Sequence, residues 1–196
     1  MYTAQDREYW SNFAPLVQGS YYDPVDWYSP KVIATYRGFE VVFNNYYHSA
    51  VSGRHAYSGF SQCLFVDFVM LNKFTFSLKE KSTIQKFITQ FTKSNFNHSW
   101  ELNKYFIKTN NPALFSTIFE DKHIPLLLPS VKNGEIAIHQ NQGVFGDSLA
   151  AYNYELSYNR PGKFIPYNEL LQLTDLIYKI IDALMIRDII EPKSDK

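Results

Sequence analysis

The chain has 196 residues, of which 45% are hydrophobic, 17% aromatic and only 19% charged. This length suits a single domain with a real core, and a chain so poor in charge and rich in aromatic rings has the opposite bias to a disordered protein. Nineteen Lys and Arg residues balance nineteen Asp and Glu residues. The sequence therefore lacks the cationic excess on which nucleic-acid binding draws, and no nucleic acid is expected as a partner.

The first thirty residues predict a helix followed by a loop. Apolar residues recur with helical spacing between positions 5 and 17, whereas residues 19–30, GSYYDPVDWYSP, have the Pro, Ser and Asp content of a loop. Its aromatic rings could form a ligand or partner surface by stacking on a sugar, a base or a peptide, or they could anchor the segment on a sheet. These rings belong to Tyr21, Tyr22, Trp27 and Tyr28.

Between residues 31 and 80 the apolar residues alternate with the period of β-strands. KVIATYR and FEVVFNNYY flank Arg37-Gly38 and predict a hairpin. Residues 48–56 are expected to be a polar loop, and YSGFSQCLFVDFVML a long strand that pairs with KFTFSLK across residues 72–73. In the long strand Leu64 and Val66 share a fully apolar face that predicts the core side, so Asp67 is expected to face solvent.

The rest of the chain combines three helices with further strands. A capping-box pattern predicts a helix from Ser82, and Asn111 followed by Pro112 predicts the start of another that runs to about residue 128. Residues 99–109 are expected to form a strand or a loop leading into one. Strands are expected at residues 135–139 and 148–158, and a loop at residues 159–162. A last helix spans about residues 166–187, with apolar residues at heptad spacing that are typical of a helix covering a sheet.

Predicted strands come mostly in neighbouring pairs and do not alternate with helices. This order indicates an α+β fold with a mainly antiparallel sheet of about five to seven strands. Helices, including the long C-terminal one, would pack on this sheet. The whole chain, residues 1–196, is expected to form one domain, with residues 1–30 wrapping its core.

Motifs that would define an activity are missing. The glycine patterns of nucleotide sites, the H-E-x-x-H and C-x-x-C metal motifs and the G-x-S-x-G nucleophile motif do not occur. No cofactor, resident metal or catalytic residue is therefore predicted. The weak candidates for a small hydrolase or metal-dependent enzyme are His48, His55 and Asp67, which could meet if the loop at residues 48–56 folds back. Alternatively, the two histidines are ordinary polar loop residues.

The single cysteine, Cys63, cannot form an internal disulfide and lies among apolar residues, so a buried, inert thiol is expected. The first ten residues lack the features of a signal peptide, and no apolar run reaches about 18 residues. We therefore expect a cytoplasmic chain without a membrane segment.

Several segments occur in an order that resembles a known family: YRGFEVVFNNYY, YSGFSQCLFVDF, ELNKYFIKTNNPALFSTIF, HIPLLLPSV, EIAIHQNQGVF and a last apolar helix. The chain is similar, over about residues 36–185, to a family of uncharacterised bacterial proteins that share a domain of unknown function. Many members place this domain after a pair of transmembrane helices, which this sequence lacks. The resemblance implies no catalytic role for any residue.

These observations favour a non-catalytic binding or scaffold domain that acts through protein–protein contacts or self-association. The enzyme with His48, His55 and Asp67 is the alternative from another class. A toxin-neutralising or phage-related partner protein is a further alternative.

Overall fold

The computed structural model describes residues 2–23, 29–52, 55–81, 102–119, 122–140, 143 and 153–193; for residues 48–52 and 55–57 it describes the backbone alone. Its helices are α1 (Ala4–Phe13), α3 (Pro112–Phe119), α4 (Ile124–Leu127) and α5 (Tyr167–Met185), with 3-10 turns η1 (Ala14–Val17), η2 (Leu102–Lys104) and η3 (Leu128–Val131). Its strands are β1 (Ser20–Tyr22), β2 (Lys31–Tyr36), β3 (Phe39–Ser52), β4 (His55–Met70), β5 (Phe76–Glu80), β6 (Tyr105–Thr109), β7 (Glu135–Gln140), β8 (Asn153–Pro161) and β9 (Ile190–Pro192).

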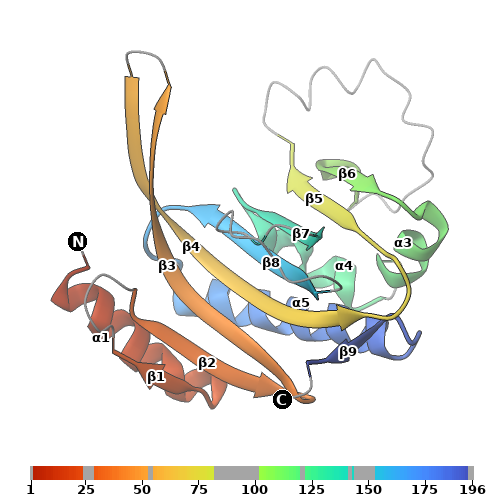
Figure 1. Cartoon of the computed structure of the whole chain (residues 1–196), viewed down its shortest axis with the longest axis horizontal. Coiled ribbons are helices and arrows are strands. Elements are labelled where there is room, and N and C mark those ends of the chain that lie inside the picture. The colour runs from red at the N-terminus through yellow and green to blue at the C-terminus, as the bar shows by residue number, and fades with distance from the viewer. Residues whose placement is uncertain are drawn as a thin grey trace.

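The described strands form one antiparallel sheet in the order β1-β2-β3-β4-β8-β7-β5-β6, and β9 pairs with the end of β4 (Figure 1). The predicted α+β class and antiparallel sheet are confirmed. The predicted number of five to seven strands is wrong, because the sheet has nine. The two additional strands, β1 and β9, span three residues each, which is too short for a period-two pattern to show in the sequence.

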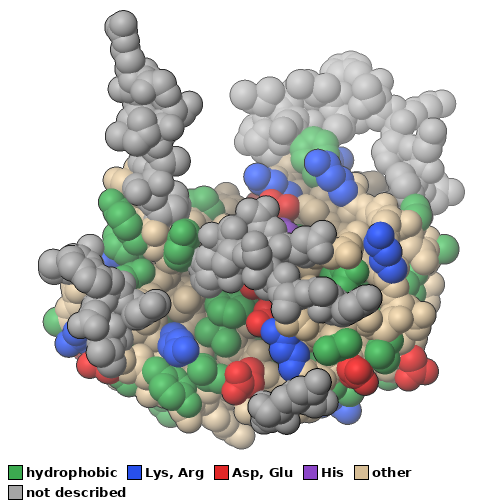
Figure 2. Space-filling model, in the orientation of Figure 1, with side chains coloured by type: hydrophobic (Ala, Val, Ile, Leu, Met, Phe, Trp, Pro, Cys, Tyr) green, Lys and Arg blue, Asp and Glu red, His purple; other side chains and the backbone are tan. Residues whose placement is uncertain are grey.

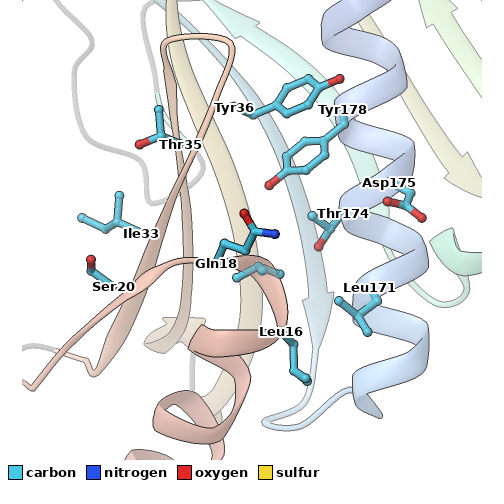
Figure 3. Close-up of a pocket in the computed structure, with 11 residues that line it drawn as sticks. Leu16, Gln18, Ser20, Ile33, Thr35, Tyr36, Leu171, Thr174, Asp175 and Tyr178 are labelled. Atoms are coloured by element: carbon cyan, nitrogen blue, oxygen red, sulfur yellow. The ribbon is translucent and has the colours of Figure 1, made fainter.

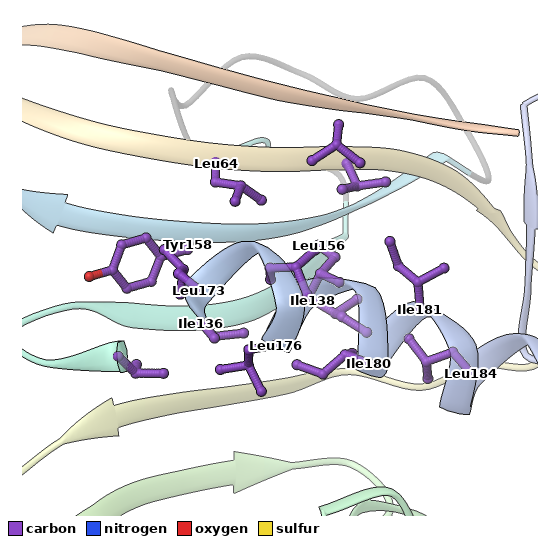
Figure 4. Close-up of a cluster of buried hydrophobic side chains, with 14 of the residues drawn as sticks. Leu64, Ile136, Ile138, Leu156, Tyr158, Leu173, Leu176, Ile180, Ile181 and Leu184 are labelled. Carbon is purple, nitrogen blue, oxygen red and sulfur yellow. The ribbon is translucent and has the colours of Figure 1, made fainter. Parts of the chain in front are cut away.

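Helix α5 covers the sheet and supplies much of the core (Figure 4). Its heptad residues are all buried, as expected for a helix that covers a sheet; they are Leu170, Leu173, Ile177, Ile180 and Leu184. They pack with the apolar faces of β4, β7 and β8, which include Leu64, Ile136, Ile138 and Leu156. Burial of such a continuous apolar stripe, at about 25 cal/mol per Å², is the main source of stability for this layer.

The predicted faces of β4 are confirmed. Leu64, Val66 and Phe68 are completely buried on the core side. Asp67 lies on the opposite side, where its side chain is 36% exposed. The alternation of apolar residues therefore predicted correctly which face of this strand is buried, because one of its faces is uniformly apolar.

The predicted loop at residues 48–56 is wrong. β3 continues to Ser52 and β4 begins at His55, so these residues form the end of a long hairpin. Figure 1 shows that this hairpin extends beyond the layer of helices. No described helix lies beside this end of the hairpin, so neither face of the strands needs to be apolar there and the alternating pattern disappears from the sequence.

The predicted pairing of KFTFSLK with the preceding strand is also wrong. β3 and, beyond it, β9 occupy one edge of β4, and β8 occupies the other. β5 must therefore find other partners, and it lies between β6 and β7.

The predicted loop at residues 159–162 is only partly correct. β8 continues to Pro161 before the chain turns at Gly162.

Helix α1 and the turn η1 cover the span predicted as the first helix. Thr3 and Asp6 form a capping box at the start of α1, in which the Thr3 backbone N–H and hydroxyl both donate to the Asp6 carboxylate. The same carboxylate accepts from Lys163 Nζ at 2.7 Å. This contact fixes α1 against the segment that leads into α5.

Helix α3 begins as the sequence predicts. The Leu114 backbone N–H donates to Asn111 Oδ1 at 3.1 Å, so Asn111 is the N-cap and Pro112 is the first helical residue. The predicted helix that follows Ser82 lies outside the described residues. None of the described helices is long and apolar enough to cross a membrane.

The described side chains on the face of the molecule in Figure 2 mix both signs of charge with apolar groups. No single sign dominates that view, in keeping with the equal numbers of acidic and basic residues. The described side chains of this face therefore form no extended patch of one charge.

Candidate functional site

A groove lies between strand β2 and helix α5 (Figure 3). Its volume is about 370 Å³, near the lower end for ligand sites. The lining residues come from the end of η1, from β1 and β2, and from α5: Leu16, Val17, Gln18, Ser20, Ile33, Thr35, Tyr36, Leu171, Thr174, Asp175 and Tyr178. Segments far apart in the sequence therefore build this site together.

The hairpin turn decides which backbone groups of β2 face outward. Arg37 and Gly38 have φ angles of 50° and 86°, which define a type I′ turn whose flanking residue Tyr36 is hydrogen-bonded to β3. Because the hydrogen-bonding direction alternates along a strand, the N–H and C=O of Thr35 point away from β3. β1 pairs only with residues 31–33 of β2. No strand of the described chain therefore pairs with Thr35 on this edge.

Gly19 determines where β1 begins. A Cβ atom at this position would lie 2.8 Å from Val32 Cγ1 and 2.9 Å from the Ile33 carbonyl oxygen, so a glycine is needed for the chain to approach β2 this closely. Gln18, with a φ of 53°, ends the turn η1 just before this contact. The chain thus enters β1 beside Ile33 and leaves the next residues of β2 open to the groove.

Two stacked tyrosine rings close one end of the groove. The rings of Tyr36 and Tyr178 are parallel to within 1° and their centroids are 3.9 Å apart. The Tyr36 hydroxyl donates to the Asp182 carboxylate at 3.0 Å, and Arg37 forms an ion pair with that carboxylate at 2.6 Å. Arg37 also lies over the Tyr36 ring, 5.7 Å from its centroid. These contacts fix the stack between β2 and α5.

Asp175 is the charged residue among those that line the groove. Its side chain is exposed and has no ion-pair partner within the described part of the chain. Burial, together with the nearby Tyr36 and Asp175, raises the pKa of Tyr178, so its phenol stays neutral at physiological pH. The Thr174 hydroxyl is used within the helix, where it donates to the Leu170 carbonyl. The groove is therefore weakly acidic.

Apolar side chains open to water line another part of the groove. Leu16 is 48% exposed, and Val17 and Leu171 are half-buried against the core. Exposed apolar groups that gather in a hollow gain free energy when a partner covers them. This site can therefore shield an apolar side chain.

The structure does not bring His48, His55 and Asp67 together. His48 pairs with Gly59 along the β3–β4 hairpin, and His55 pairs with Ser52 near its end. Asp67 lies much further along β4, about 40 Å from His55 at roughly 3.3 Å per residue. The loop that was expected to fold back is an extended hairpin, so these positions cannot converge on one metal ion or substrate.

Asp67 has different neighbours from those predicted. Lys193 forms an ion pair with it at 2.8 Å, and the strand register places Glu155 and then His139 beside it across β8 and β7. Sequence reasoning missed this row because only the register of three strands creates it. Burial lowers the pKa of His139, and Glu135 opposes that shift. Within the described residues, no group of three or more His, Cys, Asp or Glu side chains could hold a metal ion.

A second hollow of about 360 Å³ lies over β5, β6 and β7 and includes Ser77, Lys108 and His139 among its lining residues. The Ser77 hydroxyl donates to the Glu135 carboxylate. This serine is therefore not aligned with His139 as a nucleophile and its base would be. The hollow gives no support to a hydrolase.

The predicted aromatic surface is only partly described. Tyr21 and Tyr22 belong to β1 and not to a loop. Tyr21 packs against the core and donates its hydroxyl to Asp23 at 3.0 Å. Tyr22 is 47% exposed, with Lys31 Nζ 5.6 Å from its ring centroid. Trp27 and Tyr28 lie outside the described residues, so a partner surface made by these four rings stays a prediction.

Fold and site together define an α+β protein with an open length of strand edge beside a helix. No protein-family model, no curated protein and no solved structure matches the chain. The resemblance to uncharacterised bacterial proteins therefore stays a prediction.

Proposed function

We propose that this chain is a non-catalytic binding domain of bacterial type that acts through protein–protein contacts. The groove between β2 and α5 would receive an extended segment of a partner protein. That segment would add to the sheet beside β2, in line with β1. The same edge could instead receive a second copy of the chain, which would make the domain a self-associating scaffold.

The observation that carries this proposal is the outward-facing peptide group of Thr35. An exposed strand edge is a template for another strand, and the main-chain hydrogen bonds it forms supply affinity with little dependence on sequence. Here the edge is bordered by side chains that can contact the added segment. Leu16 and Leu171 can cover the apolar carbon atoms of a partner side chain, and this contact adds buried area to the two main-chain hydrogen bonds.

A polypeptide suits this site better than a cofactor does. The groove is small, lacks a glycine-rich phosphate loop and combines backbone donors and acceptors with apolar side chains. A toxin-neutralising or phage-related partner protein would be one form of such a binding domain. With a single cysteine that is buried, the domain is proposed to meet its partner in the cytoplasm.

Replacing Thr35 with proline tests the proposal directly. Proline removes the outward N–H but no hydrogen bond to β3, because that N–H points away from β3. We expect a threonine–valine heptapeptide, chosen because it favours an extended strand, to bind the wild type with at least about tenfold higher affinity than Thr35→Pro. Fluorescence anisotropy of the labelled peptide measures this difference. Light scattering of the protein without peptide shows whether a second copy of the chain binds to the same edge.

Two further variants separate binding from folding. Thr35→Val keeps the backbone N–H and should bind the peptide like the wild type. Leu171→Glu places a charge in the groove and should weaken binding, whereas Gln172→Glu places the same charge on the next residue of α5, outside the groove, and should not. Equal binding by Thr35→Pro and the wild type, with both proteins folded, would refute the proposed function.

A further inference from the structure

We propose that the groove selects strand segments that carry an arginine or lysine at one defined position, where the cationic group lies over the Tyr178 ring beside Asp175. This inference rests on the proposed function and names the chemistry of its partner. Three features of the site support it: the register of the open edge, the orientation of the tyrosine stack and the charge of the lining.

The register leaves one position for a side chain that points toward α5. Continuing β1 beyond Ser20, which pairs with Ile33, places Gly19 beside Ala34. The free positions along β2 are therefore those opposite Thr35 and Tyr36. Side chains alternate across a strand, and Tyr36 points toward Tyr178 of α5 (Figure 3). A partner residue opposite Tyr36 would point the same way and reach the tyrosine stack.

The tyrosine stack offers an electron-rich ring to that residue. Figure 3 shows the Tyr178 ring between Tyr36 and the part of the groove that contains Gln18 and Thr174. The face of an aromatic ring is negative and attracts a guanidinium or ammonium group within about 6 Å of its centroid. The stack already accepts one such contact from within the chain, because Arg37 lies over Tyr36. A partner's cation would make the equivalent contact with Tyr178.

The charge of the lining favours the same residue types. Asp175 is the charged side chain that lines the groove, and it lies one helical turn before Tyr178 on α5. Among the described residues no ion pair to Asp175 occurs, and Lys179, on the next turn of α5, is itself exposed to solvent. A cationic side chain would therefore gain an ion pair and a ring contact together, whereas a carboxylate would meet repulsion from both groups.

The inference is tested with four heptapeptides that are identical except for arginine, lysine, glutamine or glutamate at the central position of the threonine–valine sequence. We expect the arginine and lysine peptides to bind the wild type at least about fivefold more tightly than the glutamine peptide, and the glutamate peptide to bind most weakly. Rising salt should reduce the difference, because the ion pair is exposed.

Two variants should abolish this preference while they leave peptide binding itself in place. Asp175→Asn removes the charge and Tyr178→Leu removes the ring, so the arginine and glutamine peptides should then bind with similar affinity. Asp188→Asn is the matched control, because it removes an exposed aspartate that lies beyond the end of α5 and does not line the groove. It should keep the full preference.

The possible failures are distinct. If Thr35→Pro abolishes binding but the four peptides bind the wild type equally, the proposed function holds and the selection of a cation is refuted. If the preference for arginine persists in both Asp175→Asn and Tyr178→Leu, the cation is recognised elsewhere and the inference is wrong. If no peptide binds the wild type, both the proposed function and this inference are refuted.

Discussion

Cys63 shows how the surroundings of one side chain decide its chemistry. The thiol is buried on the sheet face opposite the helices and its Sγ lies 3.7 Å from Asn159 Oδ1. Burial, with a smaller contribution from Glu155, raises the pKa of the thiol to about 12. The thiolate, the reactive form, is therefore almost absent at neutral pH.

This residue gives a prediction for the folded protein. A pKa of about 12 lowers the thiolate fraction at pH 8 about a thousandfold relative to an ordinary cysteine. We expect Cys63 to resist 5,5′-dithiobis(2-nitrobenzoic acid) at pH 8 for hours in the native protein and to react within minutes in concentrated guanidinium chloride. Rapid labelling under native conditions would contradict both the burial and the raised pKa.

At the scale of elements, the start of α3 depends on a single side chain. Asn111 accepts the Leu114 N–H, one of the four donors that a helix leaves unpaired at its start. Asn111→Ala should lower the free energy of unfolding by about 0.5–2 kcal/mol, since the N–H loses this acceptor. Urea unfolding followed by circular dichroism measures the change.

The control for this cap is Asn111→Asp. A carboxylate accepts the same hydrogen bond and interacts favourably with the start of a helix, so its stability should stay within about 0.5 kcal/mol of the wild type. If both variants lose the same free energy, the cap is not the cause. Neither variant should change peptide binding, because α3 does not line the groove.

The elements that the sequence predicts well are those fixed by neighbouring residues. Arg37-Gly38 predicts a two-residue hairpin turn, and both residues adopt the positive φ that such a turn requires. The apolar residues at heptad spacing along α5 predict its buried face. The partners of β5 could not be predicted, because they depend on β8 and β9 occupying the two edges of the last part of β4. Both of those strands come much later in the chain, so no local pattern records the pairing.

At the scale of the whole molecule, the groove could not be predicted from the sequence for the same reason. Gln18, Thr35 and Tyr178 meet only after α1, the first hairpin and α5 have packed together. Glutamine, threonine and tyrosine are each common on protein surfaces, so none of these residues marks a site in the sequence. The predicted enzyme site failed in the opposite way, since His48 and His55 are close in sequence but the hairpin keeps them far from Asp67.

A buried ion pair connects α1 to the segment that leads into α5. The Asp6 side chain in α1 is fully buried, and Lys163, just before α5, reaches it at 2.7 Å while keeping 23% of its side chain exposed. Asn45 of β3 donates to the same carboxylate. Burial alone would raise the pKa of Asp6, but the hydrogen bonds from Lys163 and Thr3 hold it below its ordinary value. Folding therefore favours the ionised carboxylate.

Asp6→Asn should consequently destabilise the protein in a pH-dependent manner. At pH 7 we expect a loss of about 2–3 kcal/mol, less than the 3–5 kcal/mol for breaking a fully buried pair, because Lys163 retains contact with water. The pKa of Asp6 is lower in the folded than in the unfolded state, so its contribution is complete above the unfolded value of about 4 and is lost as the pH falls through the folded value. Urea unfolding of both proteins between pH 7 and pH 2 should therefore show two curves that converge in acid, where the wild-type carboxyl is protonated and resembles the amide.

Asp23→Asn, which removes an exposed pair with Arg7, should cost less than about 1 kcal/mol throughout. A difference between wild type and Asp6→Asn that stays constant down to pH 2 would show that the charge of Asp6 does not hold α1 against the segment before α5.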